Sequence, residues 1–347
     1  MRQRDDHRLR SSRPGFPSST CDDWLTFVRP CLSEALVGRE AFERLREIAR
    51  QLPGDGLAAL EIRLAPAVET VDLSLKVSRL SRLTETFFSS QTRQFLRRWS
   101  AGGLPSVASV WLELDAERSA AGLPDPVLCA EVEPGTDPVQ TLDTVFQTLD
   151  ESQRSWALRC IAEIPPPARL LYVFDLHARG TRNLRLEILG LAPQAVPAFL
   201  ARLAPHLAPA VTKAAPLLAG AERPHFSFDV GPEGIGPRAG LEGSFVKWPH
   251  REPRWRELFD RLVDRGLCAP EKRDAVFAWP GQETFWAAPG RWPAEAAGTH
   301  GVCVRALSHL KVVARSDGAP EAKVYLLFGW IGPVSTLTPG LSPKGEG

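Results

Sequence analysis

The sequence predicts an α+β fold in which a ten-stranded antiparallel β-barrel, made of five αββα units, is surrounded by helices. Pairs of strand-like segments alternate with helix-like segments along the chain, and most of the strands place apolar and polar residues at alternate positions. The apolar strand faces must be covered, and amphipathic helices can cover them. Because closure removes the exposed edges of a sheet, a barrel is favoured over the alternative, an open two-layer α/β sandwich.

Six helices are expected between and around the strand pairs, over residues 33–52, 84–99, 138–163, 193–218, 253–266 and from 270 to about 279. Strands are expected over residues 60–64, 70–78, 109–115, 127–133, 170–177, 184–189, 225–230, 238–245, 305–315 and 321–329. Prolines interrupt the segment 193–218 and should break its helix. The glycine-rich segment 231–238 joins two strands rather than a strand and a helix, which predicts a hairpin loop and not a phosphate-binding loop.

The composition excludes several classes of function. The chain has 347 residues, of which 44% are hydrophobic and 24% charged, and its formal net charge is +1. A nucleic-acid-binding protein would carry a strong basic excess, so no nucleic-acid partner is expected. No apolar run approaches the roughly 20 residues that span a bilayer, so no membrane partner is expected. The six cysteines lack the spacing of zinc ligands, and we expect neither a metal nor a cofactor.

One folded domain is predicted over residues 20–331. The segment 1–19 is rich in arginine, serine and proline, and the segment 332–347 is rich in proline, glycine, serine and threonine. Both are expected to be disordered, because neither has the apolar residues needed to build a core. The N-terminal arginines are not followed by the apolar stretch of a signal peptide, which predicts a cytoplasmic protein.

The polar strand faces are expected to line a water-accessible lumen if the barrel closes. Five basic residues lie on these faces, namely Lys76, Arg185, Arg238, Lys311 and Lys323. Such cations can bind a diphosphate and stabilise it as it leaves. A salt bridge to an inward carboxylate is the alternative role for each of them. For Lys311 and Lys323 no inward carboxylate is expected on either of their strands.

The five successive units, together with a Lys-x-Tyr motif at Lys323 and Tyr325, resemble the ABBA, or PT-barrel, aromatic prenyltransferases. The resemblance covers roughly residues 33–330. It implies metal-independent transfer of a prenyl group from an allylic diphosphate to an indole or phenol, free or within a peptide. In the fungal indole prenyltransferase branch of that family, Lys-x-Tyr pairs bind the diphosphate and shield the allylic cation, so the resemblance implies that Tyr325 joins the diphosphate-binding set. Since this chain has only two tyrosines, the shield would fall to other rings, namely Trp111, His177, His225 or His309.

The resemblance also implies an inward glutamate that accepts the proton of the nucleophile, and Glu61 and Glu113 are the candidates by position. A carboxylate near Glu113, such as Asp115, would raise its pKa toward neutrality, as general-base catalysis prefers. The structural alternative for either glutamate is an ion pair with Arg63 or Lys76. A second interpretation of the chain, favoured by the shortage of tyrosine, is a non-catalytic barrel that binds a peptide or small molecule as a biosynthetic accessory protein.

Overall fold

The computed structural model describes residues 20–54, 56–66, 68–77, 88–118, 123–145, 149–284 and 302–331. The two segments for which disorder is predicted, 1–19 and 332–347, lie outside these ranges, as does the start of the helix predicted over residues 84–99. No helix in the described ranges is long and apolar enough to cross a membrane.

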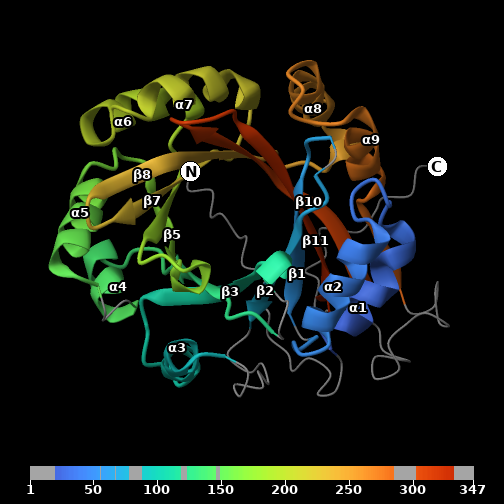
Figure 1. Ribbon diagram of the computed structural model, residues 1–347, viewed down its shortest axis with the longest axis horizontal. Helices are drawn as coiled ribbons and strands as arrows, with labels where there is room; N and C mark the ends of the chain where they lie inside the picture. The colour runs from blue at the N-terminus through green and yellow to red at the C-terminus, as the bar shows by residue number, and fades with distance from the viewer. Residues whose placement is uncertain are drawn as a thin grey trace, which may run out of the picture.

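Ten antiparallel strands close into a barrel, which confirms the predicted architecture (Figure 1). The strands are β1 (Leu57–Arg63), β2 (Val71–Val77), β3 (Val107–Leu114), β4 (Val127–Val132), β5 (Arg169–Asp175), β6 (Leu184–Leu189), β7 (His225–Gly231), β8 (Gly234–Gly243), β10 (Val302–Arg315) and β11 (Glu321–Ile331). Each pairs with the next along the chain, and β8 pairs with β10. The first and last strands also pair, so that Glu61 lies opposite Tyr325, and this pairing closes the barrel.

Helices lie around the outside of the barrel (Figure 1). They are α1 (Cys21–Val28), α2 (Arg39–Ala49), α3 (Ser90–Ser100), α4 (Pro138–Val145), α5 (Glu151–Ala162), α6 (Val196–Leu203), α7 (Ala208–Ala214), α8 (Arg254–Asp264) and α9 (Pro270–Ala278). The single helix predicted over 138–163 is wrong, because the segment forms both α4 and α5. The cause is Asp150, whose carboxylate accepts a hydrogen bond from the N–H of Gln153 at 2.8 Å and so starts a new helix.

Two further elements are absent from the sequence prediction. The helix α1 has only eight residues, too few for a clear periodicity, and Thr20 caps it by accepting from the N–H of Asp23. The short strand β9 (Gly281–Thr284) pairs with the first four residues of β10, outside the set of ten barrel strands. The segment 193–218 is interrupted as its prolines predict, and Pro197 and Pro209 occupy the first turns of α6 and α7.

The main hydrophobic core lies between the outer face of the barrel and the helices. On β1, Leu60 and Ile62 are fully buried in this core, whereas Glu61 and Arg63 line the lumen. The helices contribute large buried side chains such as Trp255 of α8. The two-residue repeat of a strand therefore separates an apolar outer face from a polar inner one, as the sequence predicts.

A buried amine fastens α9 to the end of β1. The Lys272 ammonium donates hydrogen bonds to the main-chain carbonyls of Arg63, Ala65 and Val68, at 2.9, 3.0 and 2.6 Å. Burial lowers the pKa of Lys272. The three carbonyls are nevertheless good partners for a charged donor, because together they satisfy all of its N–H groups.

Replacing Lys272 by methionine should lower the free energy of unfolding by about 1.5–3 kcal/mol, because the hydrogen bonds that three carbonyls accept from a charged donor are lost. Urea denaturation followed by circular dichroism measures the change. The matched control is Lys213→Met on the exposed face of α7, which should leave stability nearly unchanged. Equal effects of the two substitutions would show that Lys272 does not fasten α9.

Candidate active site

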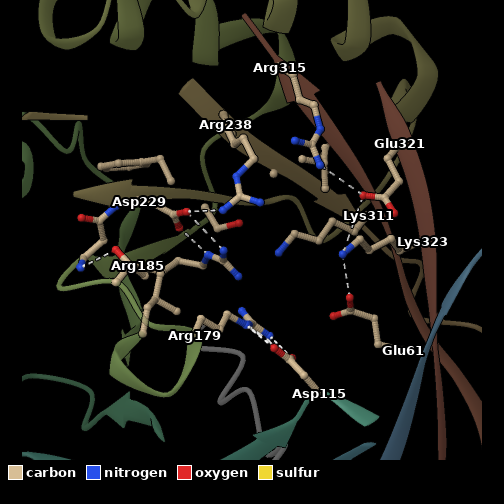
Figure 2. Close-up of a pocket in the computed structure, with 18 of the residues that line it drawn as sticks. Glu61, Asp115, Arg179, Arg185, Asp229, Arg238, Lys311, Arg315, Glu321 and Lys323 are labelled. Carbon is tan, nitrogen blue, oxygen red and sulfur yellow. Dashed lines mark hydrogen bonds and ion pairs between the residues drawn. The ribbon is translucent and has the colours of Figure 1, made fainter. Parts of the chain in front are cut away.

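A cavity of about 500 Å³ lies within the barrel and is lined by side chains from the inner strand faces and from the turn after β5 (Figure 2). Seven of the lining residues are cationic and four are acidic. The cations are Arg63, Arg179, Arg185, Arg238, Lys311, Arg315 and Lys323, and the acids are Glu61, Asp115, Asp229 and Glu321. An excess of converging cations suits a ligand that carries several negative charges.

Most of the predicted diphosphate-binding residues line this cavity, namely Arg185, Arg238, Lys311, Lys323 and Tyr325. Lys76 is not among the lining residues in the described part of the chain. Its amine lies 3.7 Å from a carboxylate oxygen of Glu131 and 5.7 Å from the centre of the Trp111 ring. The structure therefore brings the basic residues of β6, β8, β10 and β11 together and leaves Lys76 beside the aromatic ring of Trp111.

Lys311 and Lys323 both pair with carboxylates of neighbouring strands, which is the alternative role that the sequence left open for each basic residue. The Lys311 amine lies 2.6 Å from Glu242 Oε1, and the Lys323 amine lies 2.7 Å from Glu61 Oε1. Glu242 and Glu61 belong to β8 and β1, the two strands that flank the β10–β11 hairpin, and Glu242 lies directly opposite Lys311. Residues directly opposite on neighbouring strands are close enough to pair, so an inspection of the hairpin alone misses them.

Glu321 is a further partner, and it lies on β11 itself. Its Oε2 is 3.9 Å from both the Lys323 amine and the Arg315 guanidinium. Figure 2 shows Glu321 between these two cations at one end of the cavity. The strand that carries Lys323 therefore presents an inward carboxylate, and the expectation that neither strand of this hairpin does so is wrong.

Carboxylates also hold the cations on the opposite wall of the cavity (Figure 2). Arg185 and Arg238 share Asp229, at 2.7 and 3.3 Å, and Arg179 lies 2.8 Å from Asp115. Burial disfavours the charged form of Arg185, but Asp229 outweighs it and raises the pKa of Arg185. The arginines are thus held charged and oriented toward the cavity.

Arg63, Arg179 and Arg315 line the cavity although they are not among the predicted site residues. Arg63 and Arg315 end their strands on the inner face, so the alternation of polar residues could have identified them. Arg179 lies in a short 3₁₀ turn, His177–Arg179, that follows β5. The two-residue repeat of a strand says nothing about side-chain direction in such a turn, so no sequence signal assigns Arg179 to the cavity.

The pKa values of the two predicted proton acceptors, Glu61 and Glu113, are shifted in opposite directions. Glu61 accepts hydrogen bonds from Lys323 and from the Tyr325 hydroxyl. Burial alone would raise its pKa, but Lys323 and Arg63 hold the pKa of Glu61 well below its usual range. Burial raises the pKa of Glu113, against the opposing effect of Arg179 at 3.3 Å. Because a general base works best with a pKa near the working pH, Glu113 has the more suitable environment.

A small apolar cluster lies on the inner face, separate from the main core. It consists of Val127, Cys129, Phe174 and Leu176, with Trp111, Tyr172 and Ala178 packed against it. Leu176 also lines the cavity, and the Arg185 guanidinium lies 5.9 Å from the centre of the Phe174 ring. Glu113 is directly opposite Val127 in the β3–β4 pairing. The cluster therefore borders both the cationic cavity and the carboxyl group whose pKa is raised.

The predicted shield residues lie in three separate places. Trp111 belongs to the apolar cluster. His309 stacks on Tyr325 with 4.0 Å between ring centres, and the His225 ring lies 6.4 Å from the His309 ring. Neither histidine is among the residues that line the cavity in the described ranges. His177, at the start of the turn after β5, donates its main-chain N–H to Asp175.

Asp72 makes the stability of the folded chain depend on pH. Burial, and then repulsion from Glu61, raise the pKa of Asp72 to about 6, although Arg63 lies at 2.5 Å. Between pH 4 and 6 the folded chain therefore holds a proton that the unfolded chain has released. Since stability falls with rising pH wherever the folded state binds more protons, the contribution of Asp72 is lost as the pH rises through this range.

The chain should therefore lose stability relative to its Asp72→Asn variant as the pH rises from 4 to 6, and the difference should be constant above pH 7. Urea denaturation of both proteins at unit pH steps measures it. Because the comparison is a difference, titration of the other carboxylates largely cancels. A difference that does not change with pH, or that changes in the opposite sense, would contradict the raised pKa.

Comparison with known proteins identifies the fold. No protein-family model matches the sequence, and no curated protein matches it. Among solved structures, the prenyltransferase PriB in its apo form has a TM-score of 0.50 at 13% identity, covering 88% of this chain and 94% of that one. The 5-dimethylallyltryptophan synthase of Streptomyces coelicolor has a TM-score of 0.49 at 12% identity, and the match covers 88% of this chain and 95% of that one. AnaPT from Neosartorya fischeri has a TM-score of 0.49 at 11% identity, and the match covers 88% of this chain and 91% of that one.

The match to PriB, together with the closed barrel of ten antiparallel strands and its outer helices, shows that the chain has the PT-barrel fold. The predicted resemblance is thereby confirmed at the level of the fold. At 13% identity the match does not extend to individual site residues.

Proposed function

We propose that this protein transfers a prenyl group from an allylic diphosphate to an aromatic acceptor inside the barrel lumen, without a metal ion. The observation that carries the proposal is the cavity of about 500 Å³, in which seven cations converge beside the apolar cluster and its aromatic rings. An allylic diphosphate needs both features, because its leaving group is a polyanion and its carbocation is stabilised by π faces and quenched by water. The PT-barrel fold shared with PriB, a prenyltransferase, supports it.

The diphosphate is proposed to bind between Lys311 and Lys323 on one wall and Arg185 and Arg238 on the other, with Tyr325 beside them once its hydroxyl turns from Glu61 to the diphosphate. The bond between the allylic carbon and the diphosphate oxygen breaks, and its electron pair stays with the diphosphate. The cationic side chains neutralise that developing charge, which is the part a metal ion would otherwise supply. We do not include Lys76, because it pairs with Glu131.

The aromatic acceptor, an indole or phenol that is free or part of a peptide, is proposed to lie against the apolar cluster. Trp111, Tyr172 and Phe174 would then provide aromatic faces for the cation, and the Tyr325 ring, with His309 stacked behind it, would provide a second wall. A carbon or heteroatom of the acceptor forms the new bond to the allylic carbon. The proton that the acceptor loses passes to Glu113.

A non-catalytic accessory role is the second candidate, and one observation favours it. Lys311, Lys323, Arg185 and Arg179 all have carboxylate partners within 2.8 Å. A diphosphate would have to compete with these carboxylates, whereas a neutral or mixed-charge peptide would not. The two functions differ in whether diphosphate binds and in whether a new bond forms.

Mass spectrometry tests the proposal directly. The full chain is incubated with dimethylallyl, geranyl or farnesyl diphosphate and a panel of indoles, phenols and tryptophan- or tyrosine-containing peptides, with and without a chelator. We expect an acceptor heavier by one prenyl group, formed equally well in chelator. A Lys311→Ala/Lys323→Ala variant should lose the product.

The outcomes separate the two candidates. No product from any pair, together with no rise in melting temperature on adding inorganic diphosphate, would contradict prenyl transfer. If a peptide or small molecule nevertheless raised the melting temperature, the accessory role would be favoured. Full activity of the double lysine variant would overturn the assignment of Lys311 and Lys323 but not the reaction.

A further inference from the structure

Three neighbouring strands bring metal-binding side chains together on the inner face of the barrel. Glu187 on β6, His225 on β7 and Glu242 on β8 each offer one ligand atom, and these atoms all lie within 4.8 Å of one another. His225 is directly opposite Glu242 in the β7–β8 pairing. Both glutamates are buried, with exposed fractions of 5% and 2%. None of the three residues is among those that line the cationic cavity.

A fourth donor lies beside this group. The Nε2 atom of His309 on β10 is 3.2 Å from Glu242 Oε2. The other ring nitrogen of His309, Nδ1, contacts the Ser308 hydroxyl at 2.9 Å, which orients the ring with Nε2 toward the cluster. Two imidazoles and two carboxylates form a donor set that suits Zn²⁺ and related transition-metal ions, and the two carboxylates balance the charge of a divalent ion.

The contacts within the cluster are compatible with a bound ion. Glu242 uses Oε1 for Lys311 at 2.6 Å and for the Ser227 hydroxyl at 3.2 Å, so its Oε2 remains directed at His309. His225 Nδ1 and Glu187 Oε1 are 2.7 Å apart, a contact that a shared proton occupies when no ion is bound. Burial disfavours that proton, but Glu187 outweighs it and raises the pKa of His225. An ion would take the place of the proton.

We propose that Glu187, His225, Glu242 and His309 form a binding site for a transition-metal ion of the Zn²⁺ type. The ion would tie together β6, β7, β8 and β10 from inside the lumen and so stabilise the barrel. Lys311 would stay on Glu242 Oε1 as an outer partner. The site is made of residues outside the cavity lining, so the proposal holds whether or not the protein transfers prenyl groups.

Isothermal titration of the full chain with ZnCl₂ tests the site. The protein is prepared without a polyhistidine tag and treated with a chelator beforehand. We expect one ion per chain. His225→Gln should weaken binding by at least about tenfold. His206→Gln, at an exposed histidine away from the cluster, is the matched control and should bind as the unaltered chain does.

Two further measurements make the result decisive. The melting temperature should rise with Zn²⁺ in the unaltered chain and not in His225→Gln or His309→Gln, so that a folding defect in one variant does not hide the answer. Bound Co²⁺ should give the visible spectrum of a nitrogen and oxygen site without a thiolate-to-cobalt band, which excludes the six cysteines as ligands. Absence of Zn²⁺ binding, binding that survives in both histidine variants, or a thiolate band would each overturn the proposal.

Discussion

Replacing Lys311 by methionine should lower the free energy of unfolding by about 3–5 kcal/mol. The Lys311 amine and the Glu242 carboxylate are 2.6 Å apart, and their side chains are only 8% and 3% exposed. Removing the lysine leaves a buried carboxylate without its cation. The Ser227 hydroxyl remains near Glu242 but carries no charge. Urea or guanidinium denaturation measures the loss.

Two controls test whether the loss comes from the buried charge. The double variant Lys311→Met/Glu242→Gln removes both charges and should recover a large part of the stability, because no unpaired carboxylate is left. Arg202→Met breaks an ion pair with Glu163 whose side chains are 52% and 42% exposed, and should have a much smaller effect. A double variant as unstable as Lys311→Met would show that packing, and not charge, is responsible.

Glu113→Gln should reduce the turnover number of prenyl transfer by about 10²–10⁴-fold, the usual contribution of a general base, while KM changes little. Glutamine has the shape of glutamate but does not accept the acceptor's proton. The fold should tolerate the change, because Arg179 keeps its ion pair with Asp115 at 2.8 Å. Product formation followed by mass spectrometry gives both constants, and circular dichroism checks the fold.

The pH dependence distinguishes Glu113 from Glu61. Because burial raises the pKa of Glu113, Glu113 should become protonated on acidification before an ordinary glutamate does, and turnover should then fall. Glu113→Gln should lack this decrease. Glu61→Gln is the matched variant. Since Lys323 and Arg63 keep the pKa of Glu61 low, its substitution should act mainly through the positions of Lys323 and Tyr325 and should retain the acidic decrease. An active Glu113→Gln with an inactive Glu61→Gln would assign the base to Glu61.

Local periodicity determined the fold class and the inward face of the strands. In β1 the order Leu60, Glu61, Ile62, Arg63 states which side chains face the helices and which face the lumen, because successive residues of a strand point to opposite sides. The same rule placed Arg185, Arg238, Lys311 and Lys323 on one cavity, but it also predicted Lys76 there, and Lys76 pairs with Glu131 instead. It failed where the backbone is not extended, so Arg179 in its 3₁₀ turn was missed.

The tertiary structure alone decided which charges pair. Lys323 and Glu61 are 262 positions apart in the sequence, yet closure of β11 against β1 brings them to 2.7 Å. Glu187, His225 and Glu242 likewise meet because three strands lie side by side. A side chain's direction follows from its immediate neighbours in the chain, whereas electrostatic energy depends on distances in space. The sequence by itself therefore determined a barrel with a polar interior, and only the closed barrel decided the partner of each interior charge.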